Sequence, residues 1–158
     1  MLKYLTNCRL YTDPGKIVHI AIEDGRIRDI CAQLPEDAAI ITDAGKRIVI
    51  PGMIDTHVHG AGGGDFSSGT EKAYRQAAEA LCHMGTTSFF ATTFYRPDSD
   101  NYHLGLPGKI RAAEKEAYCA GIHLEGPFIN PLKKGGIPGT FITKPDIFIL
   151  LRIINECN

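Results

Sequence analysis

Two histidines separated by a single residue, His57 and His59, have the spacing in this chain that best suits the binding of a metal ion. They end the stretch of residues 51–60, whose apolar character predicts a buried strand. Strand side chains alternate between faces, so both imidazoles and Asp55 are expected on one face. Two neutral imidazoles at a strand end suit a first-row divalent metal such as zinc or iron. The alternative is a pair of ordinary histidines, because the His-x-His spacing is common.

A second stretch carries side chains that could take part in chemistry. It is residues 121–125, whose pattern predicts another strand that ends in a carboxylate. Alternation places His123 and Glu125 on one face, and Ile122 and Leu124 on the other, where helices can cover them. An isolated buried carboxylate is costly, so Glu125 should be protonated, paired with a cation or bound to a metal. Beside the two earlier histidines it would complete a set of two nitrogen ligands and one oxygen ligand.

Lys133 and Lys134 offer an alternative interpretation of this region. An ion pair with either lysine would satisfy Glu125 without a metal. The two lysines could also attract a phosphorylated substrate, although a solvated loop charge is the simpler interpretation. His123 is expected to fill the space beneath the site and to form a local hydrogen bond, with contact to the site as the alternative.

The strands that must position these residues fall into two groups. Residues 1 to about 50 predict short strands, and Asp24-Gly25 is a strong signal for a two-residue hairpin turn. From Ile48 onward strands alternate with helices, which is typical of parallel βαβ units. The expected strands are residues 3–10, 17–23, 26–31, 38–42, 47–50, the stretch that ends near residue 59, 86–91 and 121–125.

Three helices are predicted among these strands. The first begins with a capping box at residues 68–71 and ends at Gly85. The second spans residues 108–118, and the third has Thr143 as its cap and Pro145 in its first turn. The apolar stripes expected on the first and third helices are Tyr74, Ala77, Ala78, Leu81 and Met84, and Ile147, Leu150, Leu151 and Ile154.

Four motifs resemble those of a known family. The run Pro-Gly-x-Ile-Asp-x-His-x-His-Gly at residues 51–60 is similar to the first-strand signature of the amidohydrolase superfamily. The block His-Leu-Glu-Gly-Pro-Phe-Ile-Asn-Pro at residues 123–131 is the most specific, and it resembles the block that marks N-acetylglucosamine-6-phosphate deacetylases. The glycine run at residues 60–65 and residues 85–93 are also similar to that family, and the resemblance covers essentially the whole chain.

The resemblance implies an α/β fold, namely a partial (β/α)8 TIM barrel preceded by part of a small β-sandwich. Residues 1–49 would belong to the sandwich, and residues 50–158 would form the first three barrel strands. A full barrel needs roughly 250 residues. The chain has 158 residues, so we expect a barrel truncated part of the way round. The remaining sandwich strands are expected from the C-terminal end of a longer chain.

The resemblance also implies a metal-dependent hydrolase that removes acetate from N-acetylglucosamine 6-phosphate and leaves glucosamine 6-phosphate. Glu125 is then the metal-binding carboxylate beside His57 and His59. The chain keeps both first-strand histidines, which implies a cofactor of one or two divalent ions, zinc or iron. Gly136 and Ile137 match the family's substrate contact. Many relatives carry histidine or glutamine at the second position, and Ile137 has no side-chain hydrogen bond to offer there.

Other parts of the family's site are expected beyond residue 158. They are two further metal-binding histidines and the aspartate that acts as general acid and base, so no catalytic residue is assigned within the chain. Residues 1–158 alone are therefore expected to be inactive, and to be poorly folded or self-associating. The alternatives are a non-catalytic fragment with at most weak metal binding, and another amidohydrolase of dihydroorotase or deaminase type. The family is usually homodimeric.

Charge and cysteine content argue against several other classes of function. The chain has 17 basic and 18 acidic side chains and a formal net charge of −1, which gives no argument for nucleic acid or an anionic membrane. Its five cysteines are scattered without a Cys-x-x-Cys pair, which predicts reduced thiols in a cytoplasmic protein. The sequence shows no apolar run of transmembrane length and no signal-peptide core.

Overall fold

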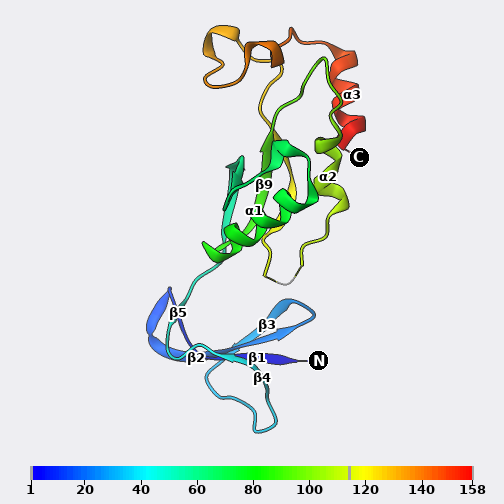
Figure 1. The fold of residues 1–158 in the computed structure, drawn as a ribbon. Coiled ribbons are helices and arrows are strands. Elements are labelled where there is room, and N and C mark those ends of the chain that lie inside the picture. Colours follow the sequence, from blue (N-terminus) through cyan, green and yellow to red (C-terminus); the bar gives the residue numbers. More distant parts are fainter. Residues whose placement is uncertain (1, 114, 158) are drawn as a thin grey trace. The chain divides into compact units, whose positions relative to one another are not determined.

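The computed structural model describes residues 2–113 and 115–157. The chain divides into two compact units, which are Met1–Pro51 (unit 1) and Gly52–Asn158 (unit 2) (Figure 1). The described residues of unit 1 form strands joined by turns, whereas unit 2 alternates strands and helices (Figure 1). This mixed α/β content agrees with the class that the sequence pattern predicts.

Unit 1 is a five-stranded sheet. Its strands are β1 (Lys3–Leu10), β2 (Asp13–Glu23), β3 (Arg26–Cys31), β4 (Ala39–Asp43) and β5 (Ile48–Val49). The order is β3-β2-β1-β4, and β5 also pairs with β1. The predicted turn at Asp24-Gly25 joins β2 to β3, with φ angles of 51° and 73°, which are the left-handed values that a type I′ turn requires.

The apolar side chains of unit 1 are only partly buried. Cys8, Ile20 and Ala44 form a small core. Ile27 and Ile50 are 64% and 60% exposed, and both line an apolar groove of about 310 Å³. Unit 1 therefore presents an open apolar surface to solvent.

Unit 2 is built on a three-stranded parallel sheet. Its strands are β6 (Met53–Val58), β9 (Thr86–Thr93) and β10 (Tyr118–Leu124), in the order β10-β9-β6. Because the strands are parallel, their carboxyl ends meet at one edge of the sheet. Glu125 lies at this edge, where its backbone N–H donates to the carbonyl of Thr93 at 2.9 Å.

The two faces of this sheet carry different side chains. Phe89 and Ala91 belong to the main hydrophobic core, and Val58 packs against it. Ile122 and Leu124 pack on a second cluster that includes helical residues, so the prediction that helices cover them is confirmed. The opposite face carries the histidines and aromatic side chains of the candidate site. They are His57, His59, Phe94 and His123.

Helix α1 (Glu71–His83) covers the sheet on its apolar side. Thr70 is its cap, with its side chain accepting a backbone N–H of the first turn. The predicted cap at Ser68 is wrong, because Ser68 ends the preceding 3-10 helix η1 (Phe66–Ser68). Met84 follows the helix and is 58% exposed, so it does not extend the buried stripe. The stripe is otherwise as predicted, with Tyr74, Ala77, Ala78 and Leu81 buried.

The second helix does not occupy the predicted residues 108–118, of which residue 114 lies outside the described part of the chain. Helix α2 spans Tyr102–Lys109 instead, and β10 already begins at Tyr118. Helix propensity is a weak preference that tertiary contacts override. Here the carboxylate of Glu116 binds the guanidinium of Arg75 on α1 at 3.0 Å, and this contact anchors the segment outside a helix.

Helix α3 (Ile147–Cys157) ends the described chain. Asp146 rather than Thr143 supplies its cap, because the Asp146 carboxylate accepts two backbone N–H groups of the first turn at 2.7 and 3.3 Å. Pro145 therefore precedes the helix. Ile153 is buried in a cluster with α2, whereas much of the predicted stripe is exposed, at Ile147, Leu150, Leu151 and Ile154. No helix in the described part of the chain is long and apolar enough to cross a membrane.

The glycine run after β6 forms a tight hairpin. Strands β7 (Gly60–Ala61) and β8 (Gly64–Asp65) pair antiparallel around a turn at Gly62-Gly63. A Cβ atom at Gly64 would overlap the backbone of Ala73 on α1, so only glycine allows this approach. The hairpin thus returns the chain beside the carboxyl end of β6.

A long loop, residues 125–146, follows β10. It contains two short 3-10 helices, η2 (Pro131–Lys133) and η3 (Gly139–Phe141). The backbone N–H of Thr143 donates to the carbonyl of Pro127 at 3.1 Å, which closes the loop at its base. Figure 1 shows this loop curling at one end of unit 2.

Candidate metal centre

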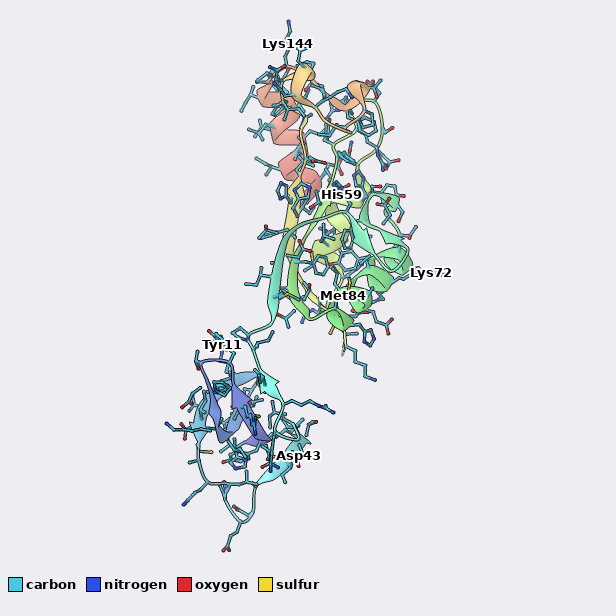
Figure 2. All side chains as sticks on the ribbon, turned by 90° about the vertical axis from the view of Figure 1, so that its left-hand side faces the viewer. Tyr11, Asp43, His59, Lys72, Met84 and Lys144 are labelled. Atoms are coloured by element: carbon cyan, nitrogen blue, oxygen red, sulfur yellow. The ribbon has the colours of Figure 1, made fainter. Side chains whose placement is uncertain are left out.

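Three side chains converge at the carboxyl edge of the parallel sheet. Their possible ligand atoms, on His57, His59 and Glu125, lie within 4.8 Å of one another. The Nε2 atom of His59 is 3.4 Å from Glu125 Oε2, and the Nε2 atom of His57 is 3.7 Å from Oε1. Figure 2 shows His59 between Lys144, at one end of unit 2, and Met84, toward the other end. The structure thus brings together the three residues that strand alternation selects, and their role as ligands stays a prediction.

The spacing of these atoms suits a small divalent ion. Tetrahedral zinc has bonds of roughly 2.0–2.2 Å to nitrogen and oxygen, so its ligand atoms lie roughly 3.3–3.6 Å apart. The two measured nitrogen–oxygen distances, 3.4 and 3.7 Å, are close to this separation. They are longer than the roughly 2.7–2.9 Å of a direct charge-assisted hydrogen bond. Two imidazoles and one carboxylate also leave a fourth position open, as catalytic zinc sites do.

The end of β6 departs from a regular ladder where it carries His57. The pairing of β6 with β9 shifts register between Asp55 and Val58. The Asp55 carboxylate accepts the backbone N–H of His57 at 3.1 Å, and the N–H of Val58 donates to Thr92 Oγ1 at 2.9 Å. Asp55, which alternation placed on the histidine face, is therefore a partner of the backbone beside His57.

His123 contacts the centre. Its Nδ1 atom is 2.8 Å from the carbonyl oxygen of Thr56. Its ring centroid is 4.6 Å from that of His57, with the two planes at 67°. The expectation of a local hydrogen bond is wrong, because this bond joins residues 67 positions apart.

An aromatic side chain covers the other histidine. The ring of Phe94 stacks on that of His59, with centroids 5.3 Å apart and planes at 24°. The carbonyl of Phe94 accepts a hydrogen bond of 2.9 Å from Nε2 of His103, which is 2% exposed. Burial lowers the pKa of His103, so this ring is held neutral. Sequence reasoning missed both residues, although continuing the alternation of β9 past Thr92 puts Phe94 on the histidine face.

A cavity of about 390 Å³ adjoins the centre. It contains the predicted substrate-contact residues Gly136 and Ile137. Ile137 is 5% exposed and offers apolar surface, whereas a Cβ at Gly136 would meet no atom within 4 Å, so its backbone is open to a ligand. Asp65 and Ser67, which sequence reasoning missed, add polar groups. The complete lining is His59, Asp65, Ser67, Phe94, Glu125, Gly136 and Ile137.

The two lysines of the loop do not satisfy Glu125. Lys134 donates to the carbonyl of Ile137 at 2.9 Å, which ties it to its own loop. Within residues 2–113 and 115–157, no ion pair joins Glu125 to Lys133 or Lys134. The ionisable groups next to the Glu125 carboxylate are the imidazoles of His57 and His59. This arrangement favours metal binding by Glu125 over an ion pair with a lysine.

Comparison with known proteins identifies relatives that are similar in sequence and in fold. The model of the Amidohydrolase family matches residues 48–156. The chain is 32% identical over 136 residues to N-acetylglucosamine-6-phosphate deacetylase of Bacillus subtilis (strain 168), covering 82% of this chain and 34% of that protein. It is 34% identical over 144 residues to the human protein of the same name, covering 84% and 34%. The chain thus spans about a third of the length of these curated relatives.

Solved structures show the same similarity. The N-acetyl-D-glucosamine-6-phosphate deacetylase of Mycobacterium smegmatis, in a mutant form bound to N-acetyl-D-glucosamine-6-phosphate, matches with a TM-score of 0.72 and 25% identity. The match covers 99% of this chain and 41% of that one. The corresponding protein of Pasteurella multocida matches with a TM-score of 0.73 at 20% identity, over 99% of this chain and 42% of that one, which is a likeness of fold.

Proposed function

Because this chain belongs to the amidohydrolase family, whose model matches residues 48–156, we propose that it forms the N-terminal part of an N-acetylglucosamine-6-phosphate deacetylase. The reaction is hydrolysis of the acetamide of N-acetylglucosamine 6-phosphate to acetate and glucosamine 6-phosphate. The observation that carries the proposal is the convergence of His57, His59 and Glu125 at one edge of a parallel sheet. The named relatives support the choice of substrate.

The proposal includes the architecture around this edge. Strands β6, β9 and β10 are the first three strands of a (β/α)8 barrel within residues 50–158, and residues 1–49 are part of a small β-sandwich. The parallel order β10-β9-β6 supports this assignment, because successive barrel strands are neighbours. The position of the three side chains supports it too, because barrel active sites lie at the carboxyl ends of the strands.

Each residue of the centre has a separate role in the proposed reaction. His57 and His59 offer neutral nitrogens, and Glu125 offers the anionic oxygen that a divalent ion, zinc or iron, requires. When bound, such an ion polarises the amide carbonyl and lowers the pKa of the attacking water. Phe94 and Ile137 keep one wall of the cavity apolar, which favours contact with the acetyl methyl group. Asp65 and Ser67 are available to sugar hydroxyls.

A fusion protein tests the proposal. Residues 1–158 are joined to the part of the Bacillus subtilis relative that lies beyond the match, and acetate release from N-acetylglucosamine 6-phosphate is measured with and without zinc. We expect metal-dependent release that is lost in His59→Ala and kept in His83→Ala, a matched control on the exposed end of α1. Residues 1–158 alone should show no release above background. A folded, zinc-loaded fusion that releases no acetate would contradict the proposal.

A further inference from the structure

We propose that His123 is a positioning residue that sets the distance between the two histidines of the centre and Glu125. It does so by tying β10, the strand that precedes Glu125, to β6, the strand that carries His57. The inference rests on the metal role proposed above for the three ligands. It does not depend on which substrate the enzyme takes.

The hydrogen bond of His123 joins two strands that do not pair. In the sheet order β10-β9-β6, β9 lies between them, and His123 is in register with Thr92 of β9. The His123 side chain nevertheless reaches the carbonyl of Thr56 on β6 at 2.8 Å. It therefore crosses the face of the middle strand on the side where the ligands lie. A change in the curvature of the sheet would stretch this bond and, at the same time, move Glu125 away from the two histidines.

The bond is made where the pairing of β6 with β9 is irregular. The register shift between Asp55 and Val58 includes Thr56 and His57, and such irregularities re-aim side chains near active sites at the cost of regular pairing. The Thr56 carbonyl belongs to the peptide that leads into His57, so holding it fixes the direction in which the imidazole leaves the strand. The ring of His123 also lies against that of His57, at 4.6 Å.

The chemistry of the bond determines the tautomer of His123. A carbonyl oxygen only accepts hydrogen bonds, so Nδ1 of His123 must carry the proton. Among the described residues the group of ligand atoms within 4.8 Å comprises His57, His59 and Glu125, and His123 is outside it. Its role is accordingly to position ligands, and partners of this kind typically change metal affinity about 10–100-fold when removed.

Zinc titration against a competing chelator tests the inference on the fusion protein described above, in which residues 1–158 are joined to the remaining part of the relative. The substitution His123→Leu removes the donor, and we expect the Kd for zinc to rise about 10–100-fold. The substitution His123→Asn places an N–H near the position of Nδ1, and it should restore affinity to within about threefold of the wild-type value. His83→Leu, at an exposed position in the last turn of α1, serves as the control and should leave the Kd unchanged. Circular dichroism of each variant checks that it folds.

A second measurement does not depend on any variant or on metal. Nitrogen-15 NMR of the metal-free wild-type fusion should show a proton on Nδ1 of His123, as the hydrogen bond to the Thr56 carbonyl requires. An Nε2–H tautomer would overturn the inference, and so would a His123→Leu variant that binds zinc as tightly as the wild type. The two proposals fail separately, because a folded wild-type fusion without zinc affinity contradicts the proposed metal centre. Binding that survives His123→Leu contradicts only the positioning role.

Discussion

Glu125 is the residue on which the charge of the candidate centre depends. His57 and His59 can offer only neutral nitrogens to an ion, so the carboxylate of Glu125 is the single anionic group among the three candidate ligands. We expect Glu125→Gln to raise the Kd for zinc by at least about tenfold, which corresponds to roughly 1.4 kcal/mol. Calorimetric titration measures this. Glu79→Gln, an exposed carboxamide substitution on α1, is the matched control, and an equal effect of both variants would contradict the assignment.

His103 makes the stability of unit 2 depend on pH. Burial lowers its pKa from the ordinary value of 6.5, and the nearby Arg96 adds to this effect. Its Nε2–H donates to the Phe94 carbonyl, and Nδ1 is buried without a partner, so the neutral ring fits and a second proton does not. The unfolded chain binds that proton more readily. The free energy of unfolding should therefore fall as the pH drops below about 6.5 and through the lowered pKa of the folded state.

Urea unfolding at about pH 8 and about pH 5.5 measures this loss. His103→Gln keeps a donor near the position of Nε2 but cannot titrate, so its loss of stability between the two pH values should be smaller than that of the wild type. His83→Gln removes an exposed histidine and should keep the wild-type pH dependence. The prediction is wrong if His103→Gln and the wild type lose stability equally.

At the scale of the elements, α1 depends on a cap that the sequence pattern misplaces. The Thr70 side chain accepts the backbone N–H of Ala73, whereas Ser68 donates to the carbonyl of Asp65 outside the helix. We expect Thr70→Ala to lower the free energy of unfolding by about 1 kcal/mol. Ser68→Ala should cost less than half as much. Chemical denaturation of both variants measures the difference. A larger loss of unfolding free energy in Ser68→Ala than in Thr70→Ala would support the capping box predicted at residue 68.

At the scale of the whole molecule, the sheet of unit 1 and helix α3 both carry exposed apolar side chains. Ile27 and Ile50 line an apolar groove and are more than half exposed, and surfaces of this kind promote association. We expect the isolated 158-residue chain to self-associate at micromolar concentration. Sedimentation velocity should show less association for the double variant Ile27→Lys and Ile50→Lys. Met84→Lys, at an exposed position in unit 2, should associate like the wild type.

The self-association prediction has a clear contrary result. A wild-type chain that sediments as a monomer over the same concentration range, with one cooperative thermal transition, would show that the groove is harmless and each unit self-sufficient. Association that persists unchanged in the double variant would place the contact elsewhere in the chain.

The sequence by itself determined the features that depend on local periodicity. A spacing of two residues puts His57 and His59 on one strand face, and Asp24-Gly25 supplies the positive φ angles of its hairpin turn. Four of the five residues of the predicted α1 stripe are buried where a helical period of 3.6 residues places them, and Met84, which follows the helix, is exposed. These results follow from bond geometry that every strand, turn or helix shares, so no knowledge of distant parts of the chain is needed.

Only the tertiary structure decided which distant groups meet. The segment expected to be the second helix is anchored by Glu116 to Arg75, and helix propensity of a few tenths of a kcal/mol per residue cannot resist such contacts. His123 bonds to Thr56, 67 positions earlier, and Phe94 covers His59. A hydrogen bond across a middle strand depends on sheet curvature and strand order. Local periods of two or 3.6 residues determine neither the sheet curvature nor the strand order. The partners of the candidate ligands are therefore known only from the assembled sheet.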